Sequence, residues 1–408
     1  MVIRIDSLIK SIATALDVVE QELLGASTNH GKRIAVLCAK MGKILCKTPD
    51  EIMSLAICAL LHDNALTEYL LVSRTSGHYD PAMKKHCVFG ERNIKTLGLK
   101  TNIKKFILYH HERADGKGPF GIKEGQGPVE SELIAIADSI DVMYDLQTLS
   151  PDKLPALKKS IADEIGKQYS KIAATAMLEI LNLDMLLSLK DEKIDETTEE
   201  AFIPWIVDVE AQSIMGLAGF ISRIIDCKSE FTRKHSTQIA NIAWFMSEYY
   251  KYSREESVML YLAAALHDIG KLFTPTAILE KPGKLTAEEF IIIKDHISKT
   301  YELLKDIEGF QSICTWASNH HEKLTGAGYP FGKKADELDF NSRLMACIDI
   351  YQAVCEKRPY HPARDHAATM QILSQMADDG SIDKSIVNDL SIALAPFDGN
   401  GLPPPKLS

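Results

Sequence analysis

The chain repeats itself, and this repeat limits the folds open to it more than any other feature does. The segment LLHDNAL around His62 matches ALHDIGK around His267, and YHHERADGKGPFG matches NHHEKLTGAGYPFG. The paired positions are His30 and His235, His62 and His267, His86 and His296, His110 and His320, and Asp138 and Asp349. Their separation grows only from 205 to 211 positions. A register kept with two small insertions predicts that one domain was duplicated.

Helical periodicity dominates both copies. EIMSLAICALLHD, ESVMLYLAAALHD and SELIAIADSIDVMYDL carry apolar residues at the spacing of a helix face, and few stretches alternate as strands do. We therefore expect an all-α protein. The run DEKIDETTEE, from Asp191 to Glu200, is acidic and poor in apolar residues, which is typical of a solvated linker. The expected organisation is an N-terminal domain over 1–190, an acidic linker over 191–210 and a C-terminal domain over 211–408.

Charge and cysteine usage restrict the partners and the compartment. The formal net charge of −10 over 408 residues argues against a broad surface for duplex nucleic acid, so an anionic ligand needs cations gathered in a pocket. The eight cysteines contain no C-x-x-C pair and are expected to be reduced core residues. No stretch resembles a signal peptide or the roughly 18 apolar residues of a spanning helix. We expect a cytoplasmic protein without membrane insertion.

The C-terminal copy contains a set of residues that suits metal ions. Its members are His235, His267, Asp268, His296, His320, His321 and Asp349. Imidazole nitrogen and carboxylate oxygen are ligands for iron, manganese and zinc. Ten of the thirteen histidines occupy matched positions of the two copies, a pattern that histidines packed in a core would not produce. Adjacent helical residues point about 100° apart, so we expect His267 to serve one ion while Asp268 bridges two.

At these residues the chain resembles the HD-GYP phosphodiesterases, a branch of the HD superfamily of metal-dependent phosphohydrolases. The matching text is HDIGK from His267, the spaced His296, HHE from His320, GAGYP from Gly326, KPGKLTAEEF from Lys281 and KRPYH from Lys357. The resemblance implies two tandem HD-type helical bundle domains. It also implies hydrolysis of a cyclic dinucleotide to a linear, 5′-phosphorylated product, with two or three metal ions.

The resemblance also implies how the ligands divide. His235, His267, Asp268 and Asp349 would hold one ion, and Asp268, His296, His320 and His321 the other. Members with three ions carry a glutamate where this chain has Phe231, so we expect two divalent ions. Iron or manganese is the first choice, with nickel, magnesium and zinc as alternatives.

Two residues are expected to carry the chemistry and four to bind substrate. Asp268 and Lys271 are the predicted catalytic residues. Lys271 follows His267 by one helical turn, so it can reach a phosphoryl oxygen; the alternative is a surface ion pair with Glu280. The predicted substrate-binding residues are Lys271, Tyr329, Arg343 and Arg358. Each arginine has a surface ion pair as its alternative, and Tyr329 is expected to stack on a base.

This copy departs from the family pattern at two places. Thr325 replaces the aspartate of D-G-x-G-Y-P, and Gln352 stands where an aspartate follows Asp349 by three residues. Neither position is a predicted metal ligand. We therefore expect these departures to affect the conformation of the loop and the substrate preference, and to leave the metal centre unchanged.

The N-terminal copy keeps every ligand type but loses cations. Its candidate second metal site consists of His30, His62, Asp63, His86, His110, His111 and Asp138. Leu66 stands where Lys271 would be and Glu132 where Arg343 would be, which opposes the binding of a dianion by charge repulsion. We expect this copy to be regulatory, structural or dimerising, and a homodimer is one predicted assembly.

The donor set together with the resemblance therefore implies a metal-dependent phosphodiesterase, and the resemblance implies that it acts on a cyclic dinucleotide. The hybrid 3′3′-cGAMP is favoured, because the tandem arrangement with a degenerate first copy resembles enzymes for that messenger, and c-di-GMP is the other candidate. Two alternatives remain, namely a catalytically silent receptor for cyclic dinucleotides and a mononucleotide phosphohydrolase of the HD superfamily.

Overall fold

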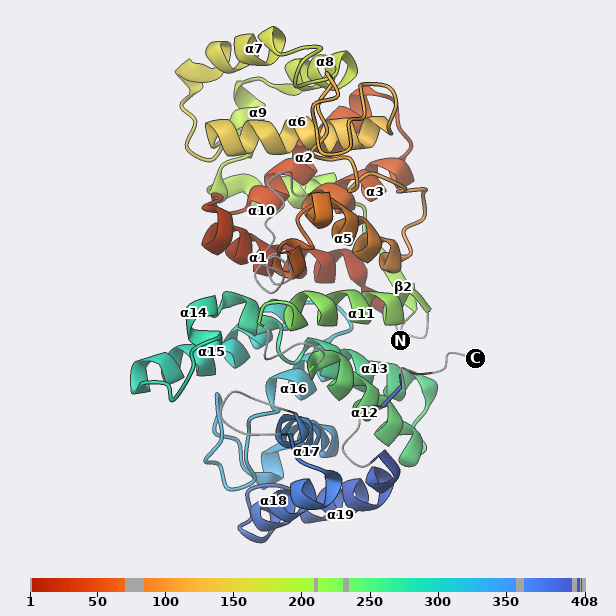
Figure 1. Ribbon diagram of the computed structural model, residues 1–408, viewed down its shortest axis with the longest axis vertical. Coiled ribbons are helices and arrows are strands. Elements are labelled where there is room, and N and C mark those ends of the chain that lie inside the picture. Colours follow the sequence, from red (N-terminus) through yellow and green to blue (C-terminus); the bar gives the residue numbers. More distant parts are fainter. Residues whose placement is uncertain are drawn as a thin grey trace. The chain divides into compact units, whose positions relative to one another are not determined.

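The structure is a computed structural model that describes residues 2–69, 84–208, 212–229, 235–356, 363–397, 402–403 and 405. It divides into two compact units, residues 9–205 and residues 1–8 with 206–408. Helices dominate both units, and the strands β1 (Val2–Arg4) and β2 (Ile206–Asp208) pair antiparallel. The all-α prediction is confirmed (Figure 1). Among the described residues, no helix is both long and apolar enough to cross a bilayer.

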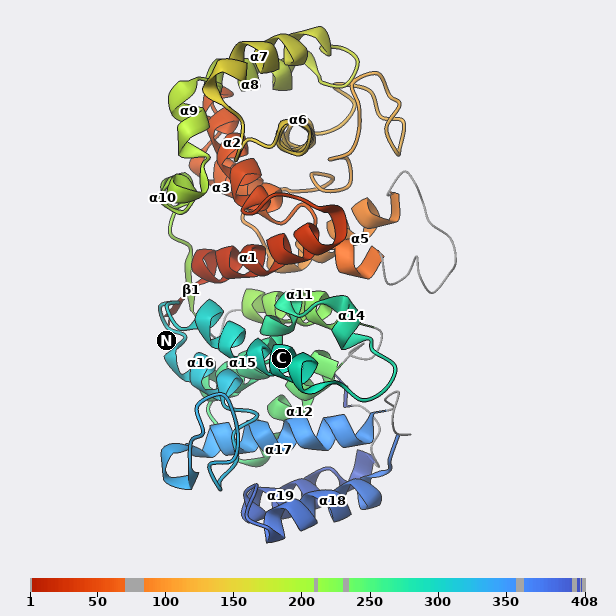
Figure 2. The ribbon, with the colours of Figure 1, turned by 90° about the vertical axis from the view of Figure 1, so that its left-hand side faces the viewer.

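The N-terminal unit takes its helices in chain order. The boundary between the units falls inside α1 (Ile5–Leu24). Then follow α2 (His30–Ile44), α3 (Pro49–Leu60), α5 (Lys84–Ile94), η1 (Lys95–Leu97), α6 (Val129–Tyr144), η2 (Pro151–Lys153), α7 (Leu154–Asp163), α8 (Lys171–Ile180), α9 (Leu183–Ser188) and α10 (Asp191–Ala201). Helix α2 packs against α3, α6, α8 and α10, so it lies at the centre of this bundle (Figure 2).

The C-terminal unit repeats this order. Its helices are α11 (Gln212–Asp226), α12 (His235–Tyr249), α13 (Arg254–Leu266), η4 (Ile269–Phe273), α14 (Thr276–Leu279), α15 (Ala287–Leu304), α16 (Gln311–Ser318), η5 (Ala335–Glu337), α17 (Phe340–Cys355), α18 (His366–Asp378), α19 (Lys384–Ala393) and η6 (Ala395–Phe397). Helix α12 packs on α13 and α17 as α2 packs on α3 and α6.

One helix in each unit carries the His-Asp pair at its C-terminal end. Every residue of α3 from Ile52 to Leu60 is buried, as is every residue of α13 from Ser257 to Leu266. A helix buried on all sides lies inside its bundle. Both helices begin with a capping box, formed by Thr48 and Glu51 in α3 and by the matched Ser253 and Glu256 in α13. The duplication therefore extends to the residues that start these helices.

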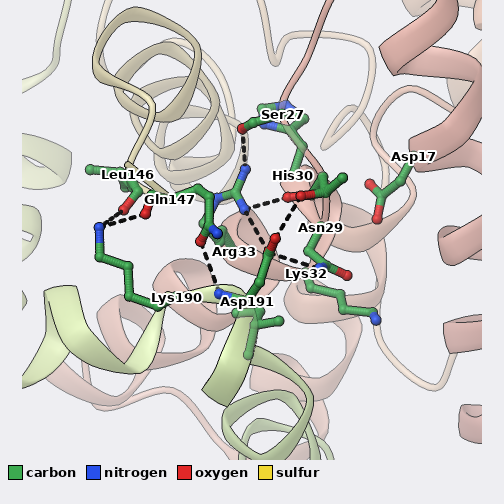
Figure 3. Close-up of polar contacts among 12 residues, drawn as sticks. Asp17, Ser27, Asn29, His30, Lys32, Arg33, Leu146, Gln147, Lys190 and Asp191 are labelled. Carbon is green, nitrogen blue, oxygen red and sulfur yellow. Dashed lines mark hydrogen bonds and ion pairs between the residues drawn. The ribbon is translucent and has the colours of Figure 1, made fainter. Parts of the chain in front are cut away.

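The acidic segment corrects one expectation. Residues 191–201 were expected to belong to a solvated linker, yet they form α10, which packs on α2. Ile194 and Thr198 are buried at helical spacing, and the side chain of Asp191 accepts a hydrogen bond from Asn29 at 2.9 Å. The Lys190 ammonium donates to the carbonyls of Leu146 and Gln147 at the start of this helix (Figure 3). The few apolar residues suffice because they share one face, while the acidic residues occupy the other.

Candidate metal centre

The C-terminal cluster is assembled from five helices or helix ends. His235 is the first residue of α12, His267 and Asp268 follow α13, and His296 lies on α15. His320 and His321 follow α16, and Asp349 lies on α17. The ligand atoms of His235, His267 and Asp268 lie within 4.8 Å of one another, and so do those of His296, His320 and His321. The structure brings all seven predicted residues together as two adjoining groups.

Asp268 faces both groups with different oxygens. Its Oδ2 atom lies 3.2 Å from His267 Nε2 and 3.9 Å from His235 Nε2. Its Oδ1 atom lies 3.3 Å from His296 Nε2 and 3.9 Å from His320 Nε2. The side chain is 1% exposed, so no bulk solvent separates the two groups. This is the geometry that a carboxylate bridging two ions requires.

Asp349 contributes in the same two-sided manner. Its Oδ1 atom lies 3.4 Å from His235 Nε2 and 3.9 Å from His267 Nε2. Its other oxygen, Oδ2, lies 3.8 Å from Nδ1 of His321. One oxygen therefore adjoins the first group, as the resemblance implies, and the second oxygen adjoins His321.

The histidine tautomers provide the test of whether metal ions fit. The Nδ1 atom of His267 donates to Ala264 O at 2.7 Å. His296 and His320 make the same bond to the carbonyl three residues earlier, at 2.5 and 2.6 Å. A proton on Nδ1 leaves Nε2 with a lone pair. In all three rings Nε2 is buried and has no hydrogen-bond partner among the described residues. The Oδ1 atom of Asp268 is likewise buried and lacks a hydrogen-bond partner there. Buried acceptors without donors, converging on one space, are what a cation site requires.

The electrostatics of the cluster agree with this donor set. Burial lowers the pKa of His321 to about 4, so this imidazole is neutral at physiological pH. Burial opposes the charge on Asp349, but the hydrogen bond from His235 and nearby imidazoles hold the pKa of Asp349 well below its usual range. Burial also opposes the charge on His235, yet its bonds to Asp349 and Glu356 raise its pKa to about 9. A metal ion must displace the proton of His235.

The HHE and GYP motifs prove to be structurally coupled. Glu322 is 3% exposed, and its carboxylate accepts backbone N–H bonds from Phe331 at 2.7 Å and Lys333 at 3.0 Å. A Cβ atom on Gly328 would lie 2.5 Å from Glu322 Cα, so only glycine lets the loop pass this close. Glu322 is thus a loop-shaping residue, which the sequence motif alone does not reveal.

A second glycine brings His296 to the cluster. A Cβ atom on Gly270 would lie 1.9 Å from the carbonyl oxygen of His296, a distance that no side chain can occupy. Thr300, one turn after His296, accepts a hydrogen bond from Gly270 N and donates one to His267 O, both at 3.1 Å. The glycine of HDIGK therefore allows α15 to lie against the His-Asp pair.

The predicted substrate-binding residues have different surroundings. Lys271 Nζ lies 2.5 Å from Asp268 Oδ2, and its side chain is 16% exposed, so its ammonium group contacts the cluster. The ring of Tyr329 lies 4.9 Å from that of His321, with Lys294 Nζ 4.8 Å from the Tyr329 centroid. Lys294 is a cation near the site that no motif indicated.

Arg343 has contacts that favour its structural alternative. Its guanidinium donates to Leu338 O at 2.9 Å, to Ala335 O at 2.5 Å and to Asp383 at 3.2 Å. These bonds tie α17 to the preceding loop and to the start of α19. Two further positions, Arg358 and Phe231, lie outside the described residues, so their predicted roles stay predictions.

The N-terminal copy repeats the cluster. The ligand atoms of His30, His62 and Asp138 lie within 4.8 Å of one another, as do those of Asp63, His86, His110 and His111. His62 and His110 also donate from Nδ1 to the carbonyl three residues earlier, and their Nε2 atoms lack hydrogen-bond partners in the described part of the chain. Asp63 lies between the two groups here, with Oδ1 2.8 Å from His86 Nε2 and Oδ2 3.7 Å from His62 Nε2.

The difference between the copies lies beside this cluster. Leu66, at the position of Lys271, is buried at 1% exposure and brings no charge to Asp63. Glu132, at the position of Arg343, accepts a hydrogen bond from Gly125 N at 3.0 Å. The N-terminal copy therefore retains the donor set for cations and lacks the ammonium group next to it.

Comparisons with known proteins agree with this duplication. The HD domain family matches residues 29–143, and a related HD domain family matches residues 219–386. The chain is 27% identical over 387 residues to the 3'3'-cGAMP-specific phosphodiesterase 1 of Vibrio cholerae, covering 92% of this chain and 88% of that protein. It is 35% identical over 319 residues to the 3'3'-cGAMP-specific phosphodiesterase 3 of the same organism, and this match covers 77% of this chain and 68% of that protein. The crystal structure of the V. cholerae cyclic GMP-AMP phosphodiesterase V-cGAP3 superposes with a TM-score of 0.66 at 20% identity, covering 98% and 100%, which supports the fold.

Proposed function

Because the chain belongs to the HD domain family, we propose that it is a metal-dependent phosphodiesterase that hydrolyses a cyclic dinucleotide at its C-terminal cluster. The product is a linear, 5′-phosphorylated dinucleotide. The observation that carries this proposal is the pair of histidine groups on either side of Asp268, in which the Nε2 atoms of His267, His296 and His320 are buried and have no hydrogen-bond partner among the described residues. The relatives named above as 3'3'-cGAMP-specific phosphodiesterases support the same reaction.

The cluster is proposed to hold two divalent ions, iron or manganese by preference. His235, His267, Asp268 and Asp349 are the ligands of one, and Asp268, His296, His320 and His321 those of the other. Two such ions, when bound, would lower the pKa of a water between them and neutralise phosphoryl oxygens. Glu356 keeps His235 oriented through its bond to Nδ1 at 3.0 Å.

Lys271 is proposed to bind a non-bridging oxygen of the scissile phosphate. Its ammonium is anchored 2.5 Å from Asp268, so it is held where negative charge develops in the transition state. Tyr329 is proposed to line the substrate site. Its ring contact with His321 also fixes that imidazole. Roles for Arg343 and Arg358 in gripping the second phosphate or a base stay predictions.

The proposed substrate is 3′3′-cGAMP, with c-di-GMP as the second candidate. The names of the relatives that cover most of this chain favour the hybrid messenger, whereas shorter matches include cyclic di-GMP phosphodiesterases such as that of Thermotoga maritima, 33% identical over 212 residues. A cytoplasmic location and a homodimer are further proposals that follow from the sequence.

The experiment is an assay of the purified chain with each cyclic dinucleotide and with mononucleotides, in the presence of Mn²⁺ or Fe²⁺. Products are separated by chromatography, and bound metal is measured by elemental analysis. Turnover of 3′3′-cGAMP to a linear dinucleotide supports the proposal. Binding without turnover in a metal-loaded sample would indicate a silent receptor, and cleavage of mononucleotides alone would indicate the other branch of the superfamily.

A further inference from the structure

A cavity of about 700 Å³ opens beside the N-terminal cluster. Its lining includes His30, His111 and Asp138 of the cluster, and also Val142, Met143 and Tyr169. Small-molecule sites typically enclose about 300–1,000 Å³, so this cavity is large enough for a nucleotide as well as metal ions. All its lining residues belong to the N-terminal unit.

The cluster side of the cavity is built for cations. Asp63 and Asp138 face it, together with Glu20, which comes from α1 and lies outside the matched motif. Glu20 is 4% exposed, and its Oε2 atom has no hydrogen-bond partner among the described residues. Without bound cations these carboxylates repel an anion. Two divalent ions would bring four positive charges against the three carboxylates of Glu20, Asp63 and Asp138, so a phosphate group would become a complementary ligand at this side of the cavity.

The lining of the cavity also includes an apolar surface. Val142 and Met143 on α6 are 65% and 53% exposed, although both line the cavity. The matched residues of the C-terminal copy are the smaller Ala353 and Val354. Gln168 adds a polar group, since its side chain donates to Ser139 at 2.6 Å and both residues line the cavity. An exposed methionine beside polar groups suits the face and edge of a nucleobase.

We propose that this cavity is a second ligand site, which holds divalent cations at the N-terminal cluster and binds a nucleotide phosphoester over them without hydrolysing it. Hydrolysis is not expected because Leu66 supplies no charge where the C-terminal copy has Lys271. The inference rests on the proposed function only for the identity of the probe, 3′3′-cGAMP. Bound ligand in this unit would make the N-terminal copy a sensor rather than a second catalyst.

The test uses the full chain with His267→Ala and Asp268→Ala. These substitutions remove the carboxylate that is proposed to bridge the C-terminal ions, so that this site does not hydrolyse the probe. His320→Ala with His321→Ala serves as an alternative if the first pair impairs folding. Bound Mn²⁺ is counted by elemental analysis, and binding of 3′3′-cGAMP and of inorganic phosphate is measured by calorimetry. We expect retained Mn²⁺ and binding of both probes, and loss of all three when His62→Ala and Asp63→Ala are added.

A substitution in the apolar lining distinguishes binding of the nucleotide from binding of phosphate alone. In the same background, Met143→Asp should lower the affinity for 3′3′-cGAMP at least tenfold, while the Mn²⁺ content and the affinity for phosphate stay unchanged. Ile172→Asp is the matched control, because Ile172 is also 53% exposed but does not line the cavity. The proposal is overturned if the background variant holds no Mn²⁺ or binds no 3′3′-cGAMP, or if binding survives His62→Ala with Asp63→Ala. It is also overturned if Met143→Asp and Ile172→Asp have the same effect on 3′3′-cGAMP binding. Because turnover at the C-terminal site is not measured, failure here leaves the proposed hydrolysis intact.

In each copy a buried or half-buried carboxylate contacts Nδ1 of the first histidine. In the N-terminal copy, His30 Nδ1 lies 2.6 Å from Asp141 Oδ2, and Arg33 holds the same carboxylate with bonds of 2.7 and 2.8 Å. Arg33 and Asp141 are fully buried, and Figure 3 shows Arg33 beside His30. A carboxylate on the outer nitrogen fixes the tautomer and the ring of a metal-binding histidine.

The C-terminal copy has lost both members of this pair. Gln238 stands at the position of Arg33, and Gln352 at the position of Asp141. The carboxylate now comes from Glu356, one turn further along the chain. Its Oε2 accepts from His235 Nδ1 at 3.0 Å, and its Oε1 accepts from Gln352 Nε2 at 2.7 Å. We infer that Glu356 is a positioning residue that replaces the missing aspartate, with Gln352 holding it in place.

This inference is tested by transferring the arrangement of one copy to the other. In a chain with His62→Ala and Asp63→Ala, so that only C-terminal ions are counted, Glu356→Ala should lower Mn²⁺ affinity about 10–100-fold. Adding Gln352→Asp with Gln238→Arg should restore Mn²⁺ affinity, because it rebuilds the pair that holds His30. Affinity is measured by competition with a chelator, and thermal unfolding checks the fold. Unchanged Mn²⁺ affinity in Glu356→Ala, or no rescue by the double replacement in a folded protein, would refute the role of Glu356.

Discussion

Replacement of Lys271 by leucine tests the proposed chemistry most directly. The ammonium of Lys271 lies 2.5 Å from Asp268 Oδ2 at the edge of the cluster. If it also binds a phosphoryl oxygen, its charge matters most as negative charge grows in the transition state. Loss of one preorganised contact of this kind costs about 10²–10³ in kcat, equivalent to about 2.7–4 kcal/mol. We expect Lys271→Leu to lower kcat by that factor, with a smaller change in KM.

The N-terminal copy shows why the metal centre should survive this change. Leu66 occupies the matched position at 1% exposure, and Asp63 still adjoins His62 and His86. Removing a positive charge next to two cations also reduces repulsion, so metal affinity should stay equal or rise. The variant is therefore expected to keep its full complement of ions while it loses turnover.

The assay combines product chromatography at saturating 3′3′-cGAMP with elemental analysis of the same sample. Lys305→Leu is the matched control, because Lys305 forms an exposed i,i+3 ion pair with Glu302 and such pairs contribute about 0–1 kcal/mol. Wild-type kcat in Lys271→Leu would show that Lys271 pairs only with Asp268. Loss of metal together with activity would show that it supports the cluster rather than the phosphate.

Three further outcomes follow from the structure. His267→Ala with Asp268→Ala should abolish hydrolysis of the cyclic dinucleotide, whereas His62→Ala with Asp63→Ala should leave a folded enzyme that still hydrolyses it. Loss of turnover from the N-terminal pair of substitutions, with an unchanged circular dichroism spectrum, would contradict the assignment of catalysis to one copy. A chelator should remove activity, and Mn²⁺ or Fe²⁺ should restore it as the C-terminal unit regains two ions; a crystal structure under metal-replete conditions with one or three ions there would show that the proposed count is wrong. Glu322→Ala removes two charge-assisted hydrogen bonds, each worth about 1.5–3 kcal/mol. We therefore expect KM to rise and the midpoint of thermal unfolding to fall, with the metal content unchanged. A variant with wild-type KM would mean that the loop does not shape the substrate site.

The sequence by itself determined the duplication, the helical class and the membership of the two clusters. These were readable because they are local or periodic properties. An apolar face recurs every three to four residues, and a duplicated domain keeps its histidines in register over a hundred positions. The absence of a lysine at Leu66 was equally visible, since it needs only the alignment of the two copies.

Only the tertiary structure decided which partners those residues contact. His235 and Glu356 are 121 residues apart, and His30 and Asp141 are 111 apart, so no local pattern pairs them. The acidic charge of 191–201 suggested a linker, but burial of Ile194 and Thr198 against α2 outweighed it. The residue type of Arg343 left its partners open, and the fold places its guanidinium within bonding distance of Asp383 and of two backbone carbonyls. Side-chain type states which bonds a residue can make, whereas the fold decides which partners lie within reach.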